Sequence, residues 1–438
     1  MKKNLSKSNR REFLKTTGLT GLGLVAPGTW NAFAGNLSDY NEVQQSMIID
    51  EKNVSLIGPY GQWAASLTEG KLPSHSFRRK EFTDMETWRK QARARLVERM
   101  AIPNIGGLPK VSVKNKFEYD GLSVEEISWQ LPYGRATEAI VLKPKNAKGK
   151  LPGILAFHDH GGNKYFGKQK ITKISDQQHS MMPGHQRDYY SGLAWANEVA
   201  KRGYVVIVPD AFPFESRRVL MAEVPEHLRN GLSDTNHEKP ENITAYNSWA
   251  SQHEHIMAKS LFSAGTTWPA VYFAEDQKAL DVLCAREDVN VSNIGCGGLS
   301  GGGMRTVYMG GLDPRIKCAV CVGFMTTWKD FVLNKSFTHT WMAYVPLLPN
   351  ELDFPEILGL RVPMATLVLN DSDDTLYTLP EMQRADSILG EVYKKASLTD
   401  GQANASDKYK CSFYPGPHKF DSKMQTEAFD WFDKWLKG

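Results

Sequence analysis

A serine set among glycines is the first place in this sequence where chemistry is expected. In the stretch GLSGG, Ser300 has Gly298 two positions before it and Gly302 two positions after it. This G-x-S-x-G pattern is typical of a sharp turn between a strand and a helix, which exposes a serine hydroxyl. The glycines are needed because the turn has a positive φ, and flanking side chains would collide with the neighbouring strand and helix. The stretch therefore predicts Ser300 as a nucleophile.

A serine nucleophile needs a base that takes its proton and an acid that orients the base. With this kind of turn the chain order is Ser, then Asp or Glu, then His. His418 follows the last expected strand, in the stretch SFYPGPHKFD, and is the predicted base. The acid lies in LVLNDSDDTLYTLP, where Asp371, Asp373 and Asp374 compete. Asp374 fits best because a short apolar turn follows it, and Asp373 is the nearest alternative.

The oxyanion that forms when a serine attacks a carbonyl group requires backbone N–H donors. The first expected donor is the N–H of Gly301, the residue after the nucleophile. The second is expected from the turn after the first buried parallel strand, which has the sequence FHDHGG from residue 157. Its glycines let the backbone approach a substrate, so we predict the N–H of His160 as the second donor.

These residues match two other kinds of site less well. A phosphate or dinucleotide site needs G-x-G-x-x-G near the first strand, or Gly-Lys-Ser/Thr, and the glycine-rich stretch has neither. The pairs His158/His160 and His253/His255 have H-x-H spacing, which places two rings on one face of a strand and suits zinc. No third ligand at a characteristic spacing accompanies either pair. The prediction is a site without metal or cofactor, with the role of these histidines left open.

Alternating strands and helices must position these residues. Short apolar runs predict strands over residues 151–160, 204–211, 291–298, 317–325, 364–371 and 408–416. Helical patterns cover residues 191–203, 274–286, 379–396 and 427–438. This alternation predicts an α/β fold, a mostly parallel sheet with helices on both faces and chemistry at the carboxyl ends of its strands. Before it, alternating runs at 121–131 and 135–144 predict an antiparallel hairpin, which would supply one antiparallel strand at the edge of the sheet.

The order of these patterns suggests three parts of the chain. Residues 1–34 are an expected signal peptide, residues 35–105 are an extension of helices and loops, and residues 106–438 are the main domain. The clearest helix of the extension covers 82–100. Insertions at about 163–190, 212–268 and 325–348 interrupt the main domain, and we expect them to roof the site.

The insertions contain side chains that suit a sugar substrate, although each also has a structural interpretation. Trp328, Phe331, Trp341 and Tyr344 follow the strand after the serine turn and either stack on sugar rings or pack within a lid. Arg217, Arg218 and Arg305 either hold a carboxylate of a substrate or form ordinary salt bridges.

The first 34 residues have the features of an export signal. A basic start is followed by a short, mildly apolar stretch and the small-residue site Ala32-Phe33-Ala34. Arg10 and Arg11 resemble the twin-arginine type of signal. We therefore predict recognition by the twin-arginine export machinery, cleavage after Ala34 and a periplasmic or secreted protein. No cysteine follows the apolar stretch, so a lipid anchor is not indicated.

Composition excludes several other classes of protein. The chain has 438 residues, of which 41% are hydrophobic, and contains no run of eighteen apolar residues that would predict a membrane span. Its net charge of +4 comes from the signal, so the remainder is near −1 and offers no argument for nucleic-acid or membrane-surface binding. The five cysteines have no disulfide framework. Cys318 and Cys321 form C-x-x-C in an apolar run, where a strand would direct their side chains to opposite faces, so we interpret both as core residues.

The combination of FHDHGG, RGYVVIVPDAF, GLSGGG, DDTLYTLPEMQRAD and YPGPHKF resembles the α/β-hydrolase superfamily. It is most similar to the acetyl xylan esterase-like and dienelactone-hydrolase-like branches. The resemblance covers about 135–438 and implies a Ser300–Asp374–His418 triad in an esterase or related acyl hydrolase. It departs from the lipase-type H-G-G-G turn, because Asp159 stands where a glycine is usual.

These observations lead to one hypothesis and two alternatives. The hypothesis is an exported serine carboxylic-ester hydrolase acting on a small-molecule or oligosaccharide ester, such as the acyl groups of plant or algal polysaccharides. The first alternative is a lactone or peptide hydrolase with the same triad. The second is a non-catalytic binding protein that has kept the fold.

Overall fold

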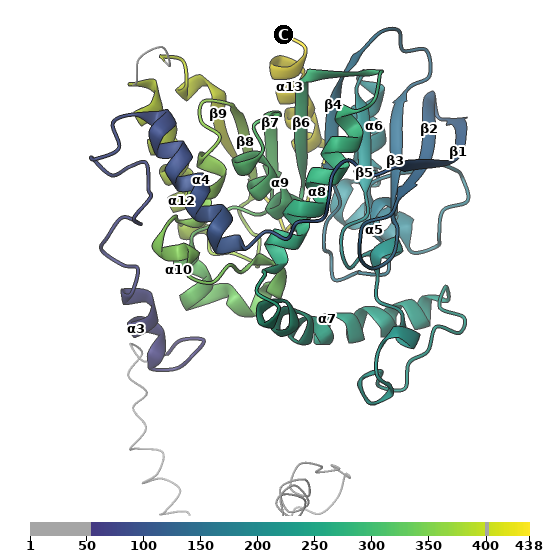
Figure 1. Cartoon of the computed structure of the whole chain (residues 1–438), viewed down its shortest axis with the longest axis horizontal. Coiled ribbons are helices and arrows are strands. Elements are labelled where there is room, and N and C mark those ends of the chain that lie inside the picture. The colour runs from purple at the N-terminus through teal and green to yellow at the C-terminus, as the bar shows by residue number, and fades with distance from the viewer. Residues whose placement is uncertain (1–53, 399–402) are drawn as a thin grey trace, which may run out of the picture. The chain divides into compact units, whose positions relative to one another are not determined.

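A nine-stranded sheet forms the centre of the described chain, which in this computed structural model comprises residues 54–398 and 403–438. The strand order is β1-β2-β3-β5-β4-β6-β7-β8-β9 (Figure 1). The strands are β1 (Val111–Tyr119), β2 (Leu122–Trp129), β3 (Thr137–Pro144), β4 (Leu151–Phe157), β5 (Val205–Pro209), β6 (Val289–Leu299), β7 (Ile316–Val322), β8 (Ala365–Asp371) and β9 (Tyr409–Tyr414). Strands β4 to β9 are mutually parallel, which confirms the predicted fold class. The expected signal peptide lies outside the described residues.

The antiparallel edge of the sheet is larger than predicted. Strands β2 and β3 form the expected hairpin, but β1 pairs with β2 as a further strand. Three antiparallel strands therefore precede the parallel ones, where the sequence analysis expected a single antiparallel strand. The reason lies in the sequence VSVKNKFEY, where Asn115 breaks the alternation of apolar residues, and in the exposure of β1 along most of its length.

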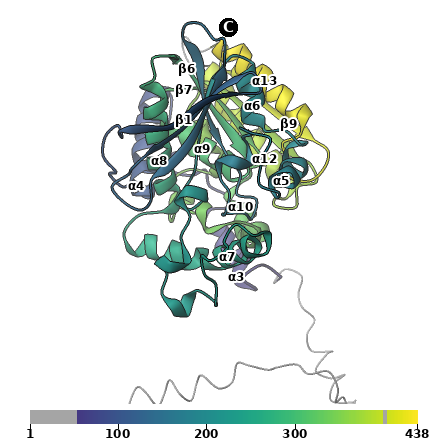
Figure 2. The same cartoon turned by 90° about the vertical axis from the view of Figure 1, so that its right-hand side faces the viewer.

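Helices cover both faces of the sheet. They are α3 (Tyr60–Ser66), α4 (Met85–Met100), α5 (Met182–Tyr190), α6 (Trp195–Lys201), α7 (Pro240–Ser263), α8 (Trp268–Cys284), α9 (Gly301–Leu312), α10 (Trp328–Asp330), α11 (Phe354–Gly359), α12 (Leu379–Ser397) and α13 (Ser422–Leu436). Helices α6 and α13 pack on one face, and α8 packs on the other (Figure 2). Helices α9 and α12 contribute to the same hydrophobic core as α8. None of the helices among residues 54–398 and 403–438 has the length and apolarity of a membrane span.

The two faces of the sheet belong to two separate hydrophobic cores. Along β4, Leu155 lies in the core under α8 and α9, whereas Ile154 lies in the core under α6 and α13. Cys321 and Cys318 divide between the same two cores, both buried and both free thiols. This confirms the prediction that the C-x-x-C residues face opposite sides of a strand and serve as core residues.

The described part of the extension is built into the main fold. Trp88, Leu96 and Met100 on one face of α4 are fully buried in the core under α8, α9 and α12. On the other side of this helix, the Arg95 and Arg99 guanidinium groups lie 2.7 and 2.8 Å from the Glu351 carboxylate. Helix α4 therefore packs as a layer of the domain and holds the segment that follows the third insertion.

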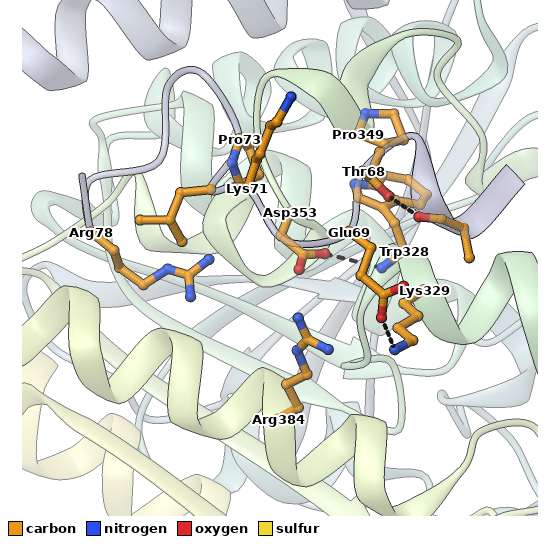
Figure 3. A pocket seen from close by; sticks show the side chains of 12 residues that line it. Thr68, Glu69, Lys71, Pro73, Arg78, Trp328, Lys329, Pro349, Asp353 and Arg384 are labelled. Atoms are coloured by element: carbon orange, nitrogen blue, oxygen red, sulfur yellow. Dashed lines mark hydrogen bonds and ion pairs between the residues drawn. The ribbon is translucent and has the colours of Figure 1, made fainter. Parts of the chain in front are cut away.

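The extension also contacts the third insertion directly. Figure 3 shows the small hollow between them, with the Glu69 carboxylate 2.7 Å from the Lys329 ammonium. The Trp328 N–H donates to Asp353 Oδ1 at 3.0 Å on the floor of the same hollow. These contacts brace the start of the 325–348 insertion against the body of the protein.

Candidate active site

Ser300 lies at the junction of β6 and α9, where the sequence pattern placed a sharp turn. Its backbone has φ 58° and ψ −118°, in the region that side chains rarely adopt. A Cβ added to Gly298 or Gly302 would lie 2.3 or 2.5 Å from the Phe157 carbonyl oxygen. Both glycines are therefore required by the close approach of β4. The Ser300 N–H donates to the Val322 carbonyl at 2.9 Å, which fixes the turn to β7.

His418 and Asp374 approach each other from the ends of β9 and β8. The His418 Nδ1–H donates to Asp374 Oδ2 at 2.6 Å, and the Leu376 N–H donates to Asp374 Oδ1 at 2.9 Å. Both oxygens of this buried carboxylate therefore accept a hydrogen bond. The other ring nitrogen of His418, Nε2, is buried and has no hydrogen-bond partner in the described chain. His418 and Ser300 line the same cavity.

The two other aspartates of this loop fasten the segment that carries His418. Asp373 Oδ2 accepts from the Gly416 N–H at 2.8 Å, and Asp371 Oδ2 accepts from the Lys419 N–H at 3.0 Å. They therefore hold the segment on both sides of the histidine, and neither carboxylate is bonded to the imidazole in the described structure.

Asp371 gives a testable pH dependence of stability. Burial raises the pKa of Asp371 to about 7, and its Oδ1 has no hydrogen-bond partner in the described chain. Between its usual pKa near 4 and pH 7, the folded state therefore holds a proton that the unfolded state has lost, so stability falls as pH rises. Asp371→Asn should reduce the fall between pH 4 and pH 7 by roughly 3 kcal/mol, because the pKa is raised by about three units, most of them within this pH range, and each unit corresponds to about 1.4 kcal/mol. Denaturant unfolding at pH 4 and pH 7 measures the free energy of unfolding at each pH. The same change in this free energy for the variant and the wild type would contradict the prediction.

The two expected oxyanion donors lie side by side. A Cβ built on Gly301 would be 3.1 Å from the backbone nitrogen of His160. Gly301 is the first residue of α9, so its N–H has no acceptor within the helix. Among the described residues, no hydrogen bond uses the His160 N–H. Both groups line the cavity that contains Ser300, and both are free to bind a developing negative charge there.

Asp159, the departure from the lipase-type turn, secures the first insertion. Its buried carboxylate accepts from the Tyr190 hydroxyl and lies 3.1 Å from His185 Nε2. The Lys170 ammonium, also fully buried, donates to the Asp159 carbonyl at 2.8 Å and to the His160 carbonyl at 2.9 Å. Burial lowers the pKa of Lys170 to about 8. Where the lipase-type turn has a flexible glycine, this turn has Asp159, whose buried polar contacts hold it in place.

The cavity has a volume of about 380 Å³ and receives side chains from all three predicted insertions. Most of these side chains belong to no motif of the sequence. They are Tyr189 from the first insertion, Ser251 and Glu254 from the second, and Thr338, His339 and Thr340 from the third. Phe324 and Leu376 complete the apolar part of the wall. Helix α7, which carries the second group, lies across the carboxyl ends of the parallel strands in both views (Figures 1 and 2).

Of the two interpretations left open for the four aromatic residues, sugar stacking is wrong for Trp328 and Phe331 and stays an untested prediction for Trp341 and Tyr344. Trp328 and Phe331 are buried and pack against the ring of Phe354, so their faces are not available to a ligand. Trp341 and Tyr344 do not line the cavity either. The structural alternative, packing within the insertion, holds for the first two, because the extension and α11 cover them.

The three arginines do not reach the cavity. Arg217 pairs with Glu275 at 2.7 Å, and Arg305 makes two hydrogen bonds to Asp276, all within the buried interior. Arg218 stacks on the Tyr165 ring, 4.7 Å from its centroid. The suggestion that these guanidinium groups hold a carboxylate in this cavity is therefore wrong, and the salt-bridge interpretation is correct for two of them.

The histidine pairs each have protein partners. His158 Nε2 accepts from the Ala211 N–H at 3.2 Å, and His160 Nε2 lies 2.9 Å from Glu254 Oε1. His253 stacks on the Trp249 ring, with centroids 4.5 Å apart. His255 Nδ1 lies 2.8 Å from the Gln252 carbonyl oxygen. Within residues 54–398 and 403–438, no three potential ligands form a metal-binding cluster.

The chain is similar to known hydrolases. No protein-family model matches it. It is 25% identical over 316 residues to "Putative hydrolase YtaP" of Bacillus subtilis, a match that covers 72% of this chain and 88% of that protein.

Solved structures share its fold at low sequence identity. A "putative acetyl xylan esterase" from Bacteroides fragilis aligns with TM-score 0.57 and 15% identity, covering 80% of this chain and 81% of that one. A glucuronoyl esterase from Solibacter usitatus aligns with TM-score 0.56 and 13% identity, covering 84% and 98%. The predicted resemblance to α/β-hydrolases is therefore confirmed at the level of the fold.

Proposed function

We propose that this protein is a serine hydrolase that cleaves carboxylic esters. The observation that carries the proposal is a single cavity lined by Ser300 on its strained turn, by His418 and by the paired donors of Gly301 and His160. Asp374 supports it by accepting from His418 at 2.6 Å, which orients the base. The proposed nucleophile, the proposed base and the proposed oxyanion donors thus line one cavity.

The mechanism proceeds through a covalent acyl-enzyme. As Ser300 Oγ attacks the ester carbonyl, His418 Nε2 takes its proton, and the bond to Asp374 stabilises the imidazolium that forms. The N–H groups of Gly301 and His160 bind the oxyanion of the tetrahedral intermediate. His418 then gives the proton to the departing alcohol. A water molecule, activated by the same imidazole, hydrolyses the acyl-enzyme and frees Ser300.

A carbohydrate ester is the substrate class that we propose. The similar solved structures include a "putative acetyl xylan esterase" and a glucuronoyl esterase, both of which are named for esters on sugars. The wall of the cavity supports the proposal by presenting hydroxyl groups from Ser251, Thr338 and Thr340 beside the rings of Tyr189 and Phe324. Such a mixture of hydroxyl and aromatic groups suits a sugar, which has polar edges and apolar faces.

A substrate panel tests this proposal. We expect kcat/KM on an acetylated xylo-oligosaccharide to exceed that on a dienelactone and on an aminoacyl anilide by at least about tenfold, a difference of about 1.4 kcal/mol. Acetate, methanol and ferulate released from matched sugar esters should be measured separately, because they identify the acyl or alkyl group. Faster lactone or peptide turnover would favour the first alternative. Failure of a fluorophosphonate to label Ser300 would favour a binding protein.

We also propose that the protein is exported. Arg10, Arg11 and the site ending at Ala34 support this, although these residues lie outside the described part of the structure. Amino-terminal sequencing of the protein recovered outside the cytoplasm should begin at Gly35. Recovery of the chain only in the cytoplasm, with Met1 retained, would contradict the proposal.

A further inference from the structure

Four hydrogen bonds hold His160 in place and use all of its polar groups except the backbone N–H. Its carbonyl oxygen accepts from Asn163 N–H at 3.0 Å and from the Lys170 ammonium at 2.9 Å. Its ring Nδ1 accepts from the Gly162 N–H at 3.1 Å. The ring proton is therefore on Nε2, which donates to Glu254 Oε1 at 2.9 Å. Because these contacts fix the residue, its backbone N–H has one orientation.

Of the four partners of His160, Glu254 is the one that lies far from the 157–162 turn in the sequence. It lies on α7, in the second insertion, and is 5% exposed. Its Oε1 also faces the Lys164 ammonium at 2.5 Å, and Lys164 is 1% exposed. Its Oε2 accepts from the Thr340 hydroxyl at 2.6 Å and from the Trp341 N–H at 3.2 Å, both in the third insertion. One carboxylate thus joins the oxyanion turn to two insertions.

The charge of this carboxylate is stabilised by its partners. Burial alone would raise the pKa of Glu254, but His160 and Lys164 lower it to about 2. Burial lowers the pKa of His160, so its ring stays neutral and keeps the Nε2 proton. The ionised carboxylate accepts three hydrogen bonds and pairs with one ammonium group, and a buried network of this kind is rigid because each lost bond leaves an unpaired polar group.

We propose that Glu254 is a positioning residue that aims the His160 N–H at the oxyanion, together with the N–H of Gly301. This inference rests on the proposed function and deepens it. It makes the oxyanion site depend on the insertions as well as on the α/β core, because the carboxylate that fixes the donor comes from α7 and is itself held by Thr340.

The paired variant Glu254→Met/Lys164→Met tests the proposal. It removes both buried charges and keeps similar side-chain volumes, a change that is often neutral for stability. Loss of one oxyanion donor costs about 10² to 10³ in kcat, so a misdirected donor should lower kcat at least about tenfold. KM should stay within about twofold. A boronic acid, whose adduct with Ser300 is tetrahedral, should bind more weakly by a similar factor.

The matched control removes another buried ion pair. Arg217→Met/Glu275→Met makes the same kind of change at a pair that is 2.7 Å apart and does not line the cavity. Its kcat and boronic-acid affinity should match the wild type, with a similar melting temperature in both paired variants. If the paired variant at Glu254 fails to fold, Glu254→Gln is measured in the same way and should lower kcat in the same direction.

The outcomes separate this inference from the function on which it rests. A folded Glu254 variant with kcat and boronic-acid affinity within twofold of the wild type would overturn the positioning role. The proposed function would still stand in that case, provided that Ser300→Ala abolishes turnover. Wild-type protein without ester turnover, or an active Ser300→Ala variant, would instead overturn the function itself.

Discussion

Replacing Ser300 with alanine is expected to lower kcat on the best ester substrate by about five to six orders of magnitude. Alanine removes the only atom that forms the acyl-enzyme, and the oxyanion donors cannot compensate because no tetrahedral intermediate forms on the protein. The melting temperature should change little, since alanine keeps the backbone of the turn and the bond from its N–H to Val322. Steady-state assays with released acetate, together with thermal unfolding, measure both effects.

Ser251 provides a matched control for this variant. It lines the same cavity from α7 but has no place in the proposed triad. Ser251→Ala should therefore change kcat by less than about tenfold, the usual range for one hydrogen bond to a ligand. More than one per cent of wild-type activity in Ser300→Ala would show that another group is the nucleophile.

Asp374→Asn is expected to lower kcat by about 10⁴. An asparagine amide cannot stabilise the imidazolium, and its NH₂ group facing His418 would favour the wrong tautomer of the ring. The substitution keeps the size of the side chain, so the bond from the Leu376 N–H to Oδ1 can remain. The pH dependence of kcat/KM should also shift, because the base loses its charged partner.

Asp373→Asn is the comparison that decides between the two adjacent aspartates. Its carboxylate accepts from the Gly416 N–H, a role that an amide oxygen can take over. We therefore expect less than a tenfold loss of kcat. A larger loss for the change at position 373 than for the change at 374 would assign the triad acid to Asp373.

The proposed catalytic residues and their order along the chain could be predicted from the sequence, whereas the residues that surround them in the cavity could not. The strand, the turn and the helix around Ser300 can be predicted from local composition. The position of His418 after a strand can be predicted in the same way, because each of these motifs is a continuous stretch of the sequence. The third glycine, Gly303, had no explanation from sequence. A Cβ there would lie 2.6 Å from the Val322 carbonyl oxygen, so the close packing of α9 against β7 requires it.

The walls of the cavity could not be predicted in the same way. Glu254, Tyr189 and His339 come from three insertions that are far apart in sequence, and no local pattern records that they meet. The aromatic prediction failed for Trp328 and Phe331 for a related reason. Whether Trp328 faces a ligand or the interior depends on α11 and on the extension, and nothing in the sequence around it shows that these elements cover it.

The exposed edge of the sheet has a consequence for how the protein behaves at high concentration. Within residues 54–398 and 403–438, no strand pairs with the outer side of β1, and the unpaired backbone groups of such an edge can pair with a second copy of a chain and lead to aggregation. Two features oppose this. Lys114 and Lys116 place charged side chains along the strand, each paired with a glutamate of β2 or β3, and the register shifts between Val113 and Asn115, which interrupts the regular ladder. An incoming strand would meet both features near the centre of β1, so the same break in the pattern that obscured β1 in the sequence also opposes self-association.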